Sequence, residues 1–301
     1  KEAPMTFSPD ASFPVINIEK GRIEGNFTAE FEPSDKLPKM VSFKCGTKVN
    51  VVPAAAEALF EGLDGDETEA LAKSMEEELG ITFTVSSEDG CLKIAASGEN
   101  GHASTPWKGK NALTGLLALI ERLPLAECGQ LKAVRALNHL MPHGDWFGAG
   151  LGIQISDEES GELTLAFSML DISEKSLEGE FDSRCPICAT KENTIDVIRK
   201  NMEAEGISFN TEELEPPHHV PADSDFVKTL LSAYESYSGR KGECIAIGGG
   251  TYVHHLKNGV AFGACLPETE NHMHGPDEFA VVDELLMSAK IFAQVIVDLC
   301  S

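Results

Sequence analysis

One stretch near the end of the chain defines both a candidate site and the element that follows it: Asn271-His272-Met273-His274-Gly275-Pro276-Asp277-Glu278. It comes directly before an apolar, helix-like run at residues 279–299. Imidazole is the commonest protein ligand for zinc-type ions, so histidines at a loop-to-helix junction indicate a candidate metal site. A catalytic zinc needs about three protein ligands and an open position for water. This stretch therefore predicts only part of a site.

Length and charge limit the protein class. At 301 residues the chain exceeds the usual size of one hydrophobic core, which predicts two domains. The balance of 24 Lys and Arg against 49 Asp and Glu gives a formal net charge of -25. Such a charge repels phosphate backbones and anionic lipid, so we expect neither nucleic acid nor a membrane surface as a partner. The acidic residues are spread through many segments, as expected for a solvated surface.

The cysteines favour a reducing compartment. They are far too sparse for a disulfide framework, and Cys185-x-x-Cys188 lacks a second pair to complete a zinc site, so ordinary thiols are expected. No run approaches the roughly 18 to 20 apolar residues of a membrane helix, and no charged-then-apolar signal opens the chain. The sequence therefore predicts a cytoplasmic protein. The eight cysteines are Cys45, Cys91, Cys128, Cys185, Cys188, Cys244, Cys265 and Cys300.

Hydrophobic periodicity predicts alternating strands and helices. Expected strands lie at residues 15–18, 40–52, 81–85, 92–96, 163–169 and 176–185. One helix is expected to begin at Pro53, where the missing N–H costs little. Further helices are expected at residues 68–79, 111–123, 131–140 and 194–205. Strand and helix groups thus occur twice, at residues 40–123 and 130–215, which predicts two similar α+β units.

The pattern changes at Glu215-Pro216-Pro217-His218-His219. An amphipathic helix is expected at residues 226–237, strands at 244–247 and 259–264, and a closing helix from 279. Residues 10–18 resemble an entering strand of the same α/β type. The middle of the chain is therefore predicted to be an insertion, with the domain boundary at residues 217–221.

Five motifs in a fixed order now point to one family. They are Ser8-Pro9-Asp10-Ala11-Ser12-Phe13-Pro14, Gly98-Glu99-Asn100-Gly101-His102-Ala103-Ser104-Thr105-Pro106, Lys108-Gly109-Lys110-Asn111-Ala112, Gly248-Gly249-Gly250-Thr251-Tyr252 and the segment from His274 to Glu278. Together they resemble the dinuclear zinc metallopeptidases that include dipeptidase V, carnosinase, aminoacylase and glutamate carboxypeptidase. The resemblance is closest to the bacterial dipeptidase V type, and it covers essentially the whole chain.

The resemblance implies an α/β fold, namely the C-terminal part of a zinc-peptidase-type catalytic domain with a large inserted α+β lid. Residues 1–20 and 215–301 would be catalytic-domain segments, and residues 21–214 would be a lid of two similar β/α units. Two zinc ions, with manganese or cobalt as alternatives, would bind in the catalytic domain, and the lid would close over a small dipeptide. A doubled lid can take the place of a dimer partner, which implies a monomer.

The resemblance also implies metal ligands. His274 would be a terminal ligand of one metal, and Asp10 would be a carboxylate ligand of the other. The alternative for Asp10 is a turn residue after Pro9. His272 is the less favoured histidine, because the spacing to Glu278 selects His274. Glu278 itself is expected to be an acidic residue at a helix N-terminus, stabilised by the helix dipole.

Two residues of the lid are implied to act on the reacting carbonyl. His102 would stabilise the oxyanion that develops in the transition state, and Asn50 would assist it. The alternatives are an ordinary loop histidine for His102 and a strand-end cap for Asn50.

Other residues are implied to bind the substrate. Arg184 would bind the free carboxylate of the dipeptide, for which the guanidinium geometry is suited, and the alternative is a surface ion pair. The turn formed by Gly248, Gly249, Gly250 and Thr251 would let the backbone approach the peptide closely. A phosphate-binding loop is not expected there, because no Lys-Ser/Thr pair follows the glycines.

The chain also departs from the family pattern. A complete member carries, upstream of the equivalent of Asp10, a His-x-Asp motif, a bridging Asp and a Glu-Glu pair that supplies the general base. None of these precedes Asp10, and the chain begins at Lys1 rather than Met. The His-x-Asp at His143-Gly144-Asp145 lies in a loop rich in Pro and Gly, and we expect a lid turn there. The chain is therefore expected to be the back two-thirds of an enzyme and inactive alone.

Several functions remain open at this point. The first is metal-dependent hydrolysis of dipeptides, broad or Xaa-His in type, by a parent protein of which this chain is a fragment. The second is an aminoacylase or deacylase of the same family. A third is a non-catalytic peptide-binding or regulatory remnant. A separate front half that restores activity by assembly is a further alternative.

Overall fold

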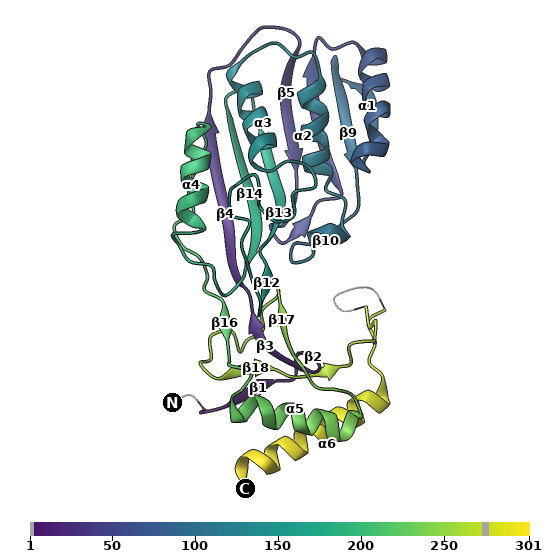
Figure 1. Ribbon diagram of the computed structural model, residues 1–301. Helices are drawn as coiled ribbons and strands as arrows, with labels where there is room; N and C mark the ends of the chain where they lie inside the picture. Colours follow the sequence, from purple (N-terminus) through teal and green to yellow (C-terminus); the bar gives the residue numbers. More distant parts are fainter. Residues whose placement is uncertain (1–2, 273–276) are drawn as a thin grey trace. The chain divides into compact units, whose positions relative to one another are not determined.

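The computed structural model describes residues 3–272 and 277–301. The chain divides into two compact units. The terminal unit comprises Lys1–Gly21, Asp157–Gly161 and Pro216–Ser301, and the inserted unit comprises Arg22–Ser156 and Glu162–Glu215. Both units mix strands and helices, as the sequence predicted (Figure 1).

The terminal unit is built on a sheet in the order β1-β18-β3-β16, with β17 also paired to β3. All five residues of β3 are buried, and Val15, Ile16 and Ile18 among them are apolar, as expected for a strand covered on both faces. Figure 1 shows α5 and α6 packed side by side on one face of this sheet. The elements are β1 (Thr6–Ser8), β2 (Ala11–Ser12), β3 (Val15–Glu19), β16 (His218–His219), α5 (Asp225–Ser238), β17 (Cys244–Ile247), β18 (Gly259–Ala261), β19 (Ala264–Cys265) and α6 (Val282–Cys300).

Aromatic side chains fill the core of the terminal unit. The Phe13 ring stacks on Tyr234, with centroids 5.2 Å apart, and meets Phe262 edge-on at 5.0 Å. Phe7 and Phe292 extend the cluster, with centroids 5.4 Å apart. Offset and edge-to-face contacts of this kind add about 0.5–1.5 kcal/mol per pair beyond burial. They anchor both ends of the segment between β1 and β3, which carries Asp10.

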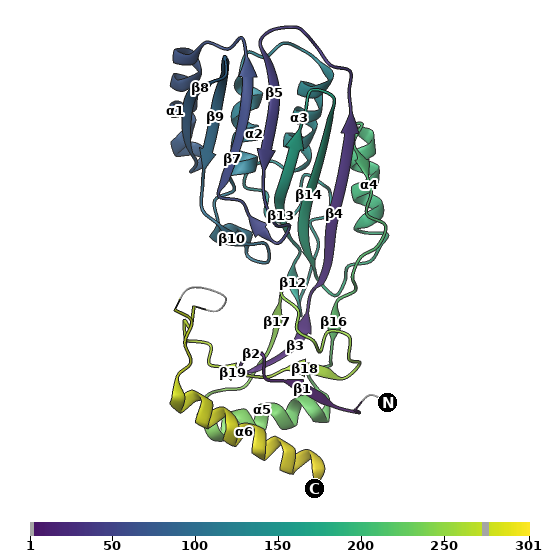
Figure 2. The ribbon, with the colours of Figure 1, turned by 180° about the vertical axis from the view of Figure 1, so that it is seen from behind.

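The inserted unit is an eight-stranded sheet in the order β15-β4-β14-β13-β5-β7-β9-β8. Figures 1 and 2 show that its four helices cover one face and leave the other open. The strands are β4 (Gly21–Glu30), β5 (Lys39–Cys45), β7 (Ala55–Glu61), β8 (Thr82–Glu88), β9 (Cys91–Ser97), β13 (Thr164–Ile172), β14 (Ser176–Cys185) and β15 (Ser208–Phe209). The helices are α1 (Gly65–Leu79), α2 (Ala112–Arg122), α3 (Gly129–Leu140) and α4 (Ile195–Ala204), and short elements lie at β11 (Ser156–Asp157) and β12 (Gly161–Glu162).

The two halves of this sheet have the same plan. Reading outward from the β13–β5 pairing, one half contains the hairpin β5–β7, helix α1 and the outer strands β9 and β8. The other half contains the hairpin β13–β14, helix α4 and the outer strands β4 and β15. The topology thus contains two similar β/α units, whereas their function as a lid stays a prediction.

One predicted element is wrong, the helix expected from Pro53. Residues 55–61 form β7, in which Ala56, Ala58 and Phe60 are buried and alternate with more exposed neighbours. Alanine favours helix, but β7 pairs with β5 on one edge and β9 on the other, and this tertiary context overrides local propensity. The predicted strand at 40–52 is also divided, because β6 (Val51–Val52) pairs with β10 (Gly101–His102) instead.

Helix α2 is fixed at its start by Asn111. The side-chain oxygen of Asn111 accepts hydrogen bonds from the amides of Leu113 and Thr114, 3.0 and 3.2 Å away. Its amide nitrogen donates to the carbonyl of Phe167 on β13, 2.7 Å away. One side chain therefore caps the helix and attaches it to the sheet.

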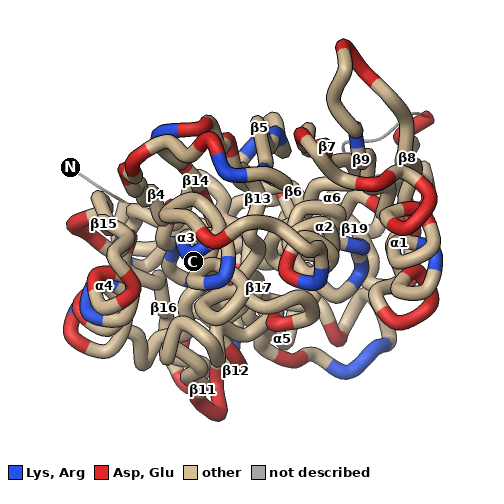
Figure 3. Tube along the Cα trace, turned by 90° about the horizontal axis from the view of Figure 1, so that it is seen from above, with Lys and Arg blue, Asp and Glu red and all other residues tan. Residues whose placement is uncertain are grey.

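The surface is acidic, and the described helices do not match a membrane span. Asp and Glu outnumber Lys and Arg along the trace and occur on α1, α4 and many loops (Figure 3). Of the helices in the described ranges, none is long and apolar enough to cross a membrane.

Candidate functional site

His102 and Asn50 lie together in the inserted unit, although 51 residues separate them in the sequence. Strand β10 pairs antiparallel with β6, which places His102 opposite Val51. The backbone amide of Ala103 then donates to the carbonyl of Asn50 at 3.0 Å. The structure thus brings together the two residues that the resemblance implied at the reacting carbonyl.

Ser104 fixes the tautomer of the His102 ring. The Ser104 backbone amide donates to Nδ1 of His102 at 3.1 Å, and the Ser104 hydroxyl lies 2.7 Å from the same atom. A backbone amide can only donate, so Nδ1 is an acceptor and the neutral ring carries its proton on Nε2. The exposed His102 ring therefore presents an N–H donor at Nε2, the group that a developing oxyanion requires.

Glycines allow the His102 loop to fold back tightly on itself. A Cβ at Gly98 would lie 2.1 Å from the carbonyl oxygen of Lys110, and a Cβ at Gly101 would lie 3.0 Å from Gly109. The backbones of Glu99 and Lys110 bridge the two arms of the loop, and their side chains form an ion pair. The Gly-rich sequence around His102 is thus required by close backbone approach.

Arg184 is buried and paired. Its Nε and Nη2 atoms donate to the two carboxylate oxygens of Asp182, at 2.6 and 2.9 Å. Arg22 binds the same carboxylate, with Nε 3.0 Å and Nη2 2.9 Å from Oδ2. Asp182 is fully buried and Arg184 is 7% exposed, so the pair is not the surface ion pair that was the alternative. A two-point bond holds the guanidinium plane in a fixed orientation.

The turn at Gly248, Gly249, Gly250 and Thr251 follows β17 directly. A Cβ at Gly249 would have no described atom within 4 Å, so packing within the described residues does not require glycine there. This open backbone suits the close approach of a peptide. The amide and hydroxyl of Thr251 both donate to Glu19, at 3.1 and 2.7 Å.

The structure describes one of the two predicted metal ligands, Asp10. Asp10 is exposed between β1 and β2, and its amide donates to the Ser8 hydroxyl at 3.3 Å. His274 lies outside the described residues. Within residues 3–272 and 277–301, no group of three or more His, Cys, Asp or Glu side chains is placed to hold a metal ion. The described residues therefore do not by themselves fit a catalytic zinc centre.

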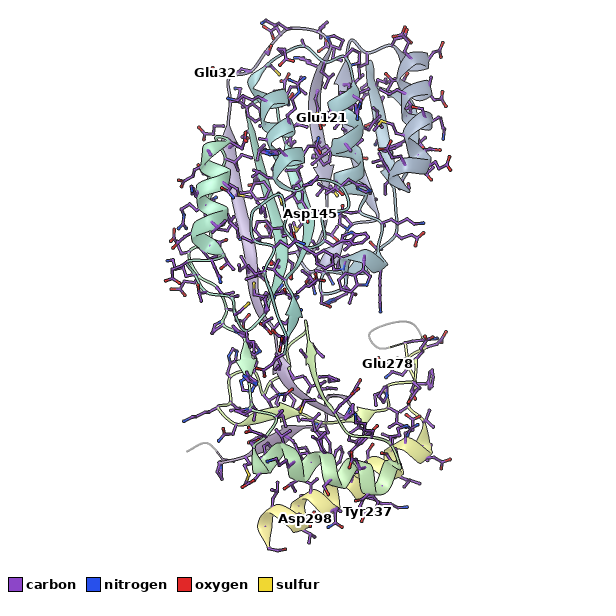
Figure 4. All side chains as sticks on the ribbon, in the orientation of Figure 1. Glu32, Glu121, Asp145, Tyr237, Glu278 and Asp298 are labelled. Atoms are coloured by element: carbon purple, nitrogen blue, oxygen red, sulfur yellow. The ribbon has the colours of Figure 1, made fainter. Side chains whose placement is uncertain are left out.

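His143 and Asp145 are occupied by bonds within the inserted unit. His143 Nε2 donates to the Leu79 carbonyl at 2.9 Å, and its Nδ1 lies 2.8 Å from the Thr114 hydroxyl. Burial lowers the pKa of His143 below its ordinary value of 6.5, against the opposing effect of the Leu79 bond. Asp145 accepts from three backbone amides in its own loop and lies beside α2 and α3 (Figure 4). Both residues contribute to a loop structure, in keeping with the predicted turn, whereas a lid function for this unit stays a prediction.

The structure also describes both residues of the Cys185-x-x-Cys188 pair. Cys185 is buried and Cys188 is exposed, and neither is in a disulfide bond within the part of the chain that the structure describes. Among the described residues, none of the eight cysteines is in a disulfide bond.

Sequence reasoning missed three buried charged or polar groups, Glu19, Asp182 and His254. Glu19 ends a strand that is otherwise largely apolar, and Asp182 lies in a strand between two buried residues. A carboxylate within a buried run is a signal, because an unpaired charge there is costly. The signal does not say which distant residue supplies the partner.

The comparisons with known proteins agree with this architecture. The model of Peptidase family M20/M25/M40 matches residues 5–298. The chain belongs to this peptidase family, which confirms the resemblance inferred from the motifs.

Two curated relatives are similar to nearly the whole chain. The chain is 37% identical over 298 residues to a "Putative dipeptidase YtjP" of Bacillus subtilis, covering 98% of this chain and 63% of that one. It is 32% identical over 303 residues to the "Beta-Ala-Xaa dipeptidase" of Lactobacillus delbrueckii subsp. lactis, covering 98% and 62%. The chain thus spans just under two thirds of the length of these curated relatives.

A solved structure supports the fold. The aminoacylhistidine dipeptidase from Vibrio alginolyticus superimposes with a TM-score of 0.54 at 14% identity, over 99% of this chain and 66% of that one. The predicted α/β fold of this family is confirmed. At such low identity the likeness bears on the fold alone.

Proposed function

We propose that the complete protein is a metal-dependent dipeptidase, broad or Xaa-His in type, and that this chain supplies its oxyanion donor and its substrate contacts. The observation that carries the proposal is the tautomer of His102. Ser104 holds Nδ1 as an acceptor, so that Nε2–H is directed to donate, and Asn50 lies alongside. The names of the two relatives, both dipeptidases, support the same substrate class.

In this proposal His102 binds the carbonyl oxygen of the scissile peptide bond. The oxygen becomes more negative as the bond is attacked, and the Nε2–H bond strengthens with it. Loss of one such donor costs roughly 10²- to 10³-fold in kcat in enzymes that use them. His102 thus acts on the transition state rather than on ground-state binding.

In this proposal Arg184 binds the free carboxylate of the dipeptide, and the backbone at Gly249 binds the main chain of the dipeptide. Asp182 orients the guanidinium beforehand, so less side-chain entropy is lost when substrate binds. A binding site of this kind selects short peptides, because a free carboxylate must lie one residue beyond the scissile bond.

We propose zinc as the cofactor, two ions in the complete enzyme, with manganese or cobalt as alternatives. Asp10 and His274 are the proposed ligands from this chain, and the general base and remaining ligands are proposed to lie outside these 301 residues. We further propose a monomer in a reducing, cytoplasmic setting, in keeping with eight cysteines that form no disulfide among the described residues and with the two similar β/α units of the eight-stranded sheet.

The test compares three substrates with the protein made from its complete gene. They are an unblocked dipeptide, the same dipeptide as its C-terminal amide, and an N-acetyl amino acid. We expect hydrolysis of the unblocked dipeptide and a higher KM for the amide, which has lost the carboxylate that Arg184 binds. Preferred cleavage of the N-acetyl amino acid would favour an aminoacylase, and binding of dipeptide without hydrolysis of any substrate would favour a non-catalytic protein.

A further inference from the structure

A buried carboxylate lies at the end of the central strand of the terminal unit. The Glu19 side chain is 1% exposed. Strand β17 pairs with β3 so that Ile247 lies opposite Glu19, and the Lys20 amide donates to the Ile247 carbonyl at 2.9 Å. Glu19 therefore lies next to the point at which β17 ends and the turn at Gly248, Gly249, Gly250 and Thr251 begins.

The two carboxylate oxygens of Glu19 bind the far end of that turn. Oε1 accepts from the Thr251 amide at 3.1 Å and from the Thr251 hydroxyl at 2.7 Å. Oε2 lies 3.0 Å from Nδ1 of His254. A Cβ at Gly250 would lie 3.7 Å from the same oxygen. The carboxylate is thus the anchor for a turn whose three glycines have no side chains of their own to fix it.

The hydrogen-bond partners of His254 define its charge. Nε2 lies 2.9 Å from the carbonyl oxygen of Pro216, and Nδ1 faces the Glu19 carboxylate. A carbonyl only accepts, and an ionised carboxylate only accepts, so both ring nitrogens must donate. His254, with 8% of its side chain exposed, is therefore an imidazolium that neutralises the buried charge of Glu19.

The charge state of Glu19 agrees with this arrangement. Burial raises the pKa of the carboxyl, but the bonds from His254 and Thr251 outweigh burial and bring the pKa below its ordinary value of 4.5. The lowered pKa means that Glu19 is ionised near neutral pH.

We propose that Glu19 and His254 are positioning residues that hold the Gly248–Thr251 turn in the conformation that binds the dipeptide backbone. This inference rests on the proposed function, because it assigns a purpose to the turn. Glycine loses more conformational freedom on ordering than any other residue, so a turn that was not anchored would have to be ordered by the substrate at a cost in affinity. The Glu19–His254 pair orders the turn beforehand.

One substitution separates geometry from charge. In Glu19→Gln the side-chain oxygen can still accept from Thr251, and the new amide can donate to Nδ1 of a neutral His254, whose Nε2–H still reaches Pro216. Glu19→Ala removes the bonds to Thr251 and the bond to His254. A positioning function predicts that Glu19→Gln restores what Glu19→Ala loses. A function of the negative charge itself would be lost equally in both variants.

The experiment uses the complete gene product labelled with ¹⁵N at glycine, threonine and histidine. We expect protons on both ring nitrogens of His254 in the wild type. We expect an unblocked dipeptide to shift the amide signals of Gly249 and Thr251, with a dissociation constant raised about tenfold in Glu19→Ala and near the wild-type value in Glu19→Gln, a tenfold change being about 1.4 kcal/mol. Tyr237→Phe, which removes a hydrogen bond to Gln294 elsewhere in the unit, is the control and should bind as the wild type does.

Each outcome decides one point. Equal dipeptide affinity in Glu19→Ala and the wild type would overturn the positioning assignment. If the wild type does not bind dipeptide, the proposed function fails. Amide exchange at Gly249 and Gly250 then decides the positioning claim alone, since Glu19→Ala but not Glu19→Gln should exchange faster, and equal exchange would overturn it.

Discussion

Replacing Asp182 by Asn should destabilise the inserted unit and weaken substrate binding through Arg184. The carboxylate of Asp182 is fully buried, accepts three hydrogen bonds of 2.6–3.0 Å from Arg184 and Arg22, and lies 2.9 Å from Nη2 of Arg22 in an ion pair. The Asp182→Asn substitution would keep the shape of the side chain but leave two guanidinium groups close together without their shared counterion. The side chain of Arg184 is only 8% exposed, whereas that of Arg22 is 27% exposed and also pairs with Glu24.

The expected magnitude follows from this burial. Removing one partner of a buried ion pair costs about 3–5 kcal/mol. In a unit of this size, each kcal/mol lowers the melting temperature by roughly 2–4 °C, so Asp182→Asn should melt roughly 10 °C below the wild type. KM should rise more for the unblocked dipeptide than for its amide, because only the free carboxylate uses the orientation of Arg184.

The assay is urea and thermal unfolding of the wild type, Asp182→Asn and a matched control. Glu57→Gln is suitable as the control, because Glu57 pairs with Lys93 at 2.8 Å on the surface, with 50% and 23% of the two side chains exposed. Such exposed pairs contribute about 0–1 kcal/mol. The reasoning is refuted if Asp182→Asn unfolds within about 1 kcal/mol of Glu57→Gln.

Three other variants test separate parts of the account. Asn111→Ala should lower the free energy of unfolding by about 1–2 kcal/mol, through loss of the α2 cap and the bond to β13, and urea unfolding that matches the wild type would contradict this. His143 has a pKa below 6.5 in the folded protein, so the unfolded chain binds the proton first and this residue reduces stability as pH falls past 6.5. The stability advantage of the wild type over His143→Gln should therefore shrink between about pH 7.5 and pH 5.5 in urea unfolding, and a constant difference would be inconsistent with it. His102→Ala should lower kcat about 10²-fold with little change in KM for an unblocked dipeptide, whereas a raised KM at constant kcat would place His102 in ground-state binding.

Elements that depend on local pattern were predictable from the sequence. The strand at residues 176–185 was predicted with the bounds that β14 has, because Leu177, Gly179 and Phe181 alternate with polar residues at its start, and this alternation is a strand signal. The helix expected from Pro53 was wrong, because the Ala-rich sequence of residues 54–58 suits a helix while the pairing of β7 on both edges makes it a strand. Local propensity contains no information about those partners.

In the candidate site, too, some residues were predictable from the sequence and others were not. The family resemblance implied Asn50 and His102 at one site, and the structure brings their backbones close through the β6–β10 pairing and the bond from the Ala103 amide to the Asn50 carbonyl. Glu19 and Asp182 were missed, because Glu19 and Thr251 lie 232 positions apart and Arg22 and Asp182 lie 160 apart. Periodicity reveals that a residue is buried, but it does not reveal a partner that only the tertiary fold supplies.

The most direct test of the account measures the amino acids that the complete gene product releases from an unblocked dipeptide, before chelation, after removal of metal with a chelator, and after zinc is returned. The account predicts release at the start, loss of release after chelation and recovery with zinc, because Asp10 and His274 are proposed ligands of a catalytic metal centre. Release that persists undiminished in fully metal-free protein, or no release from zinc-loaded protein that binds the dipeptide, would contradict the assignment of a metal-dependent dipeptidase.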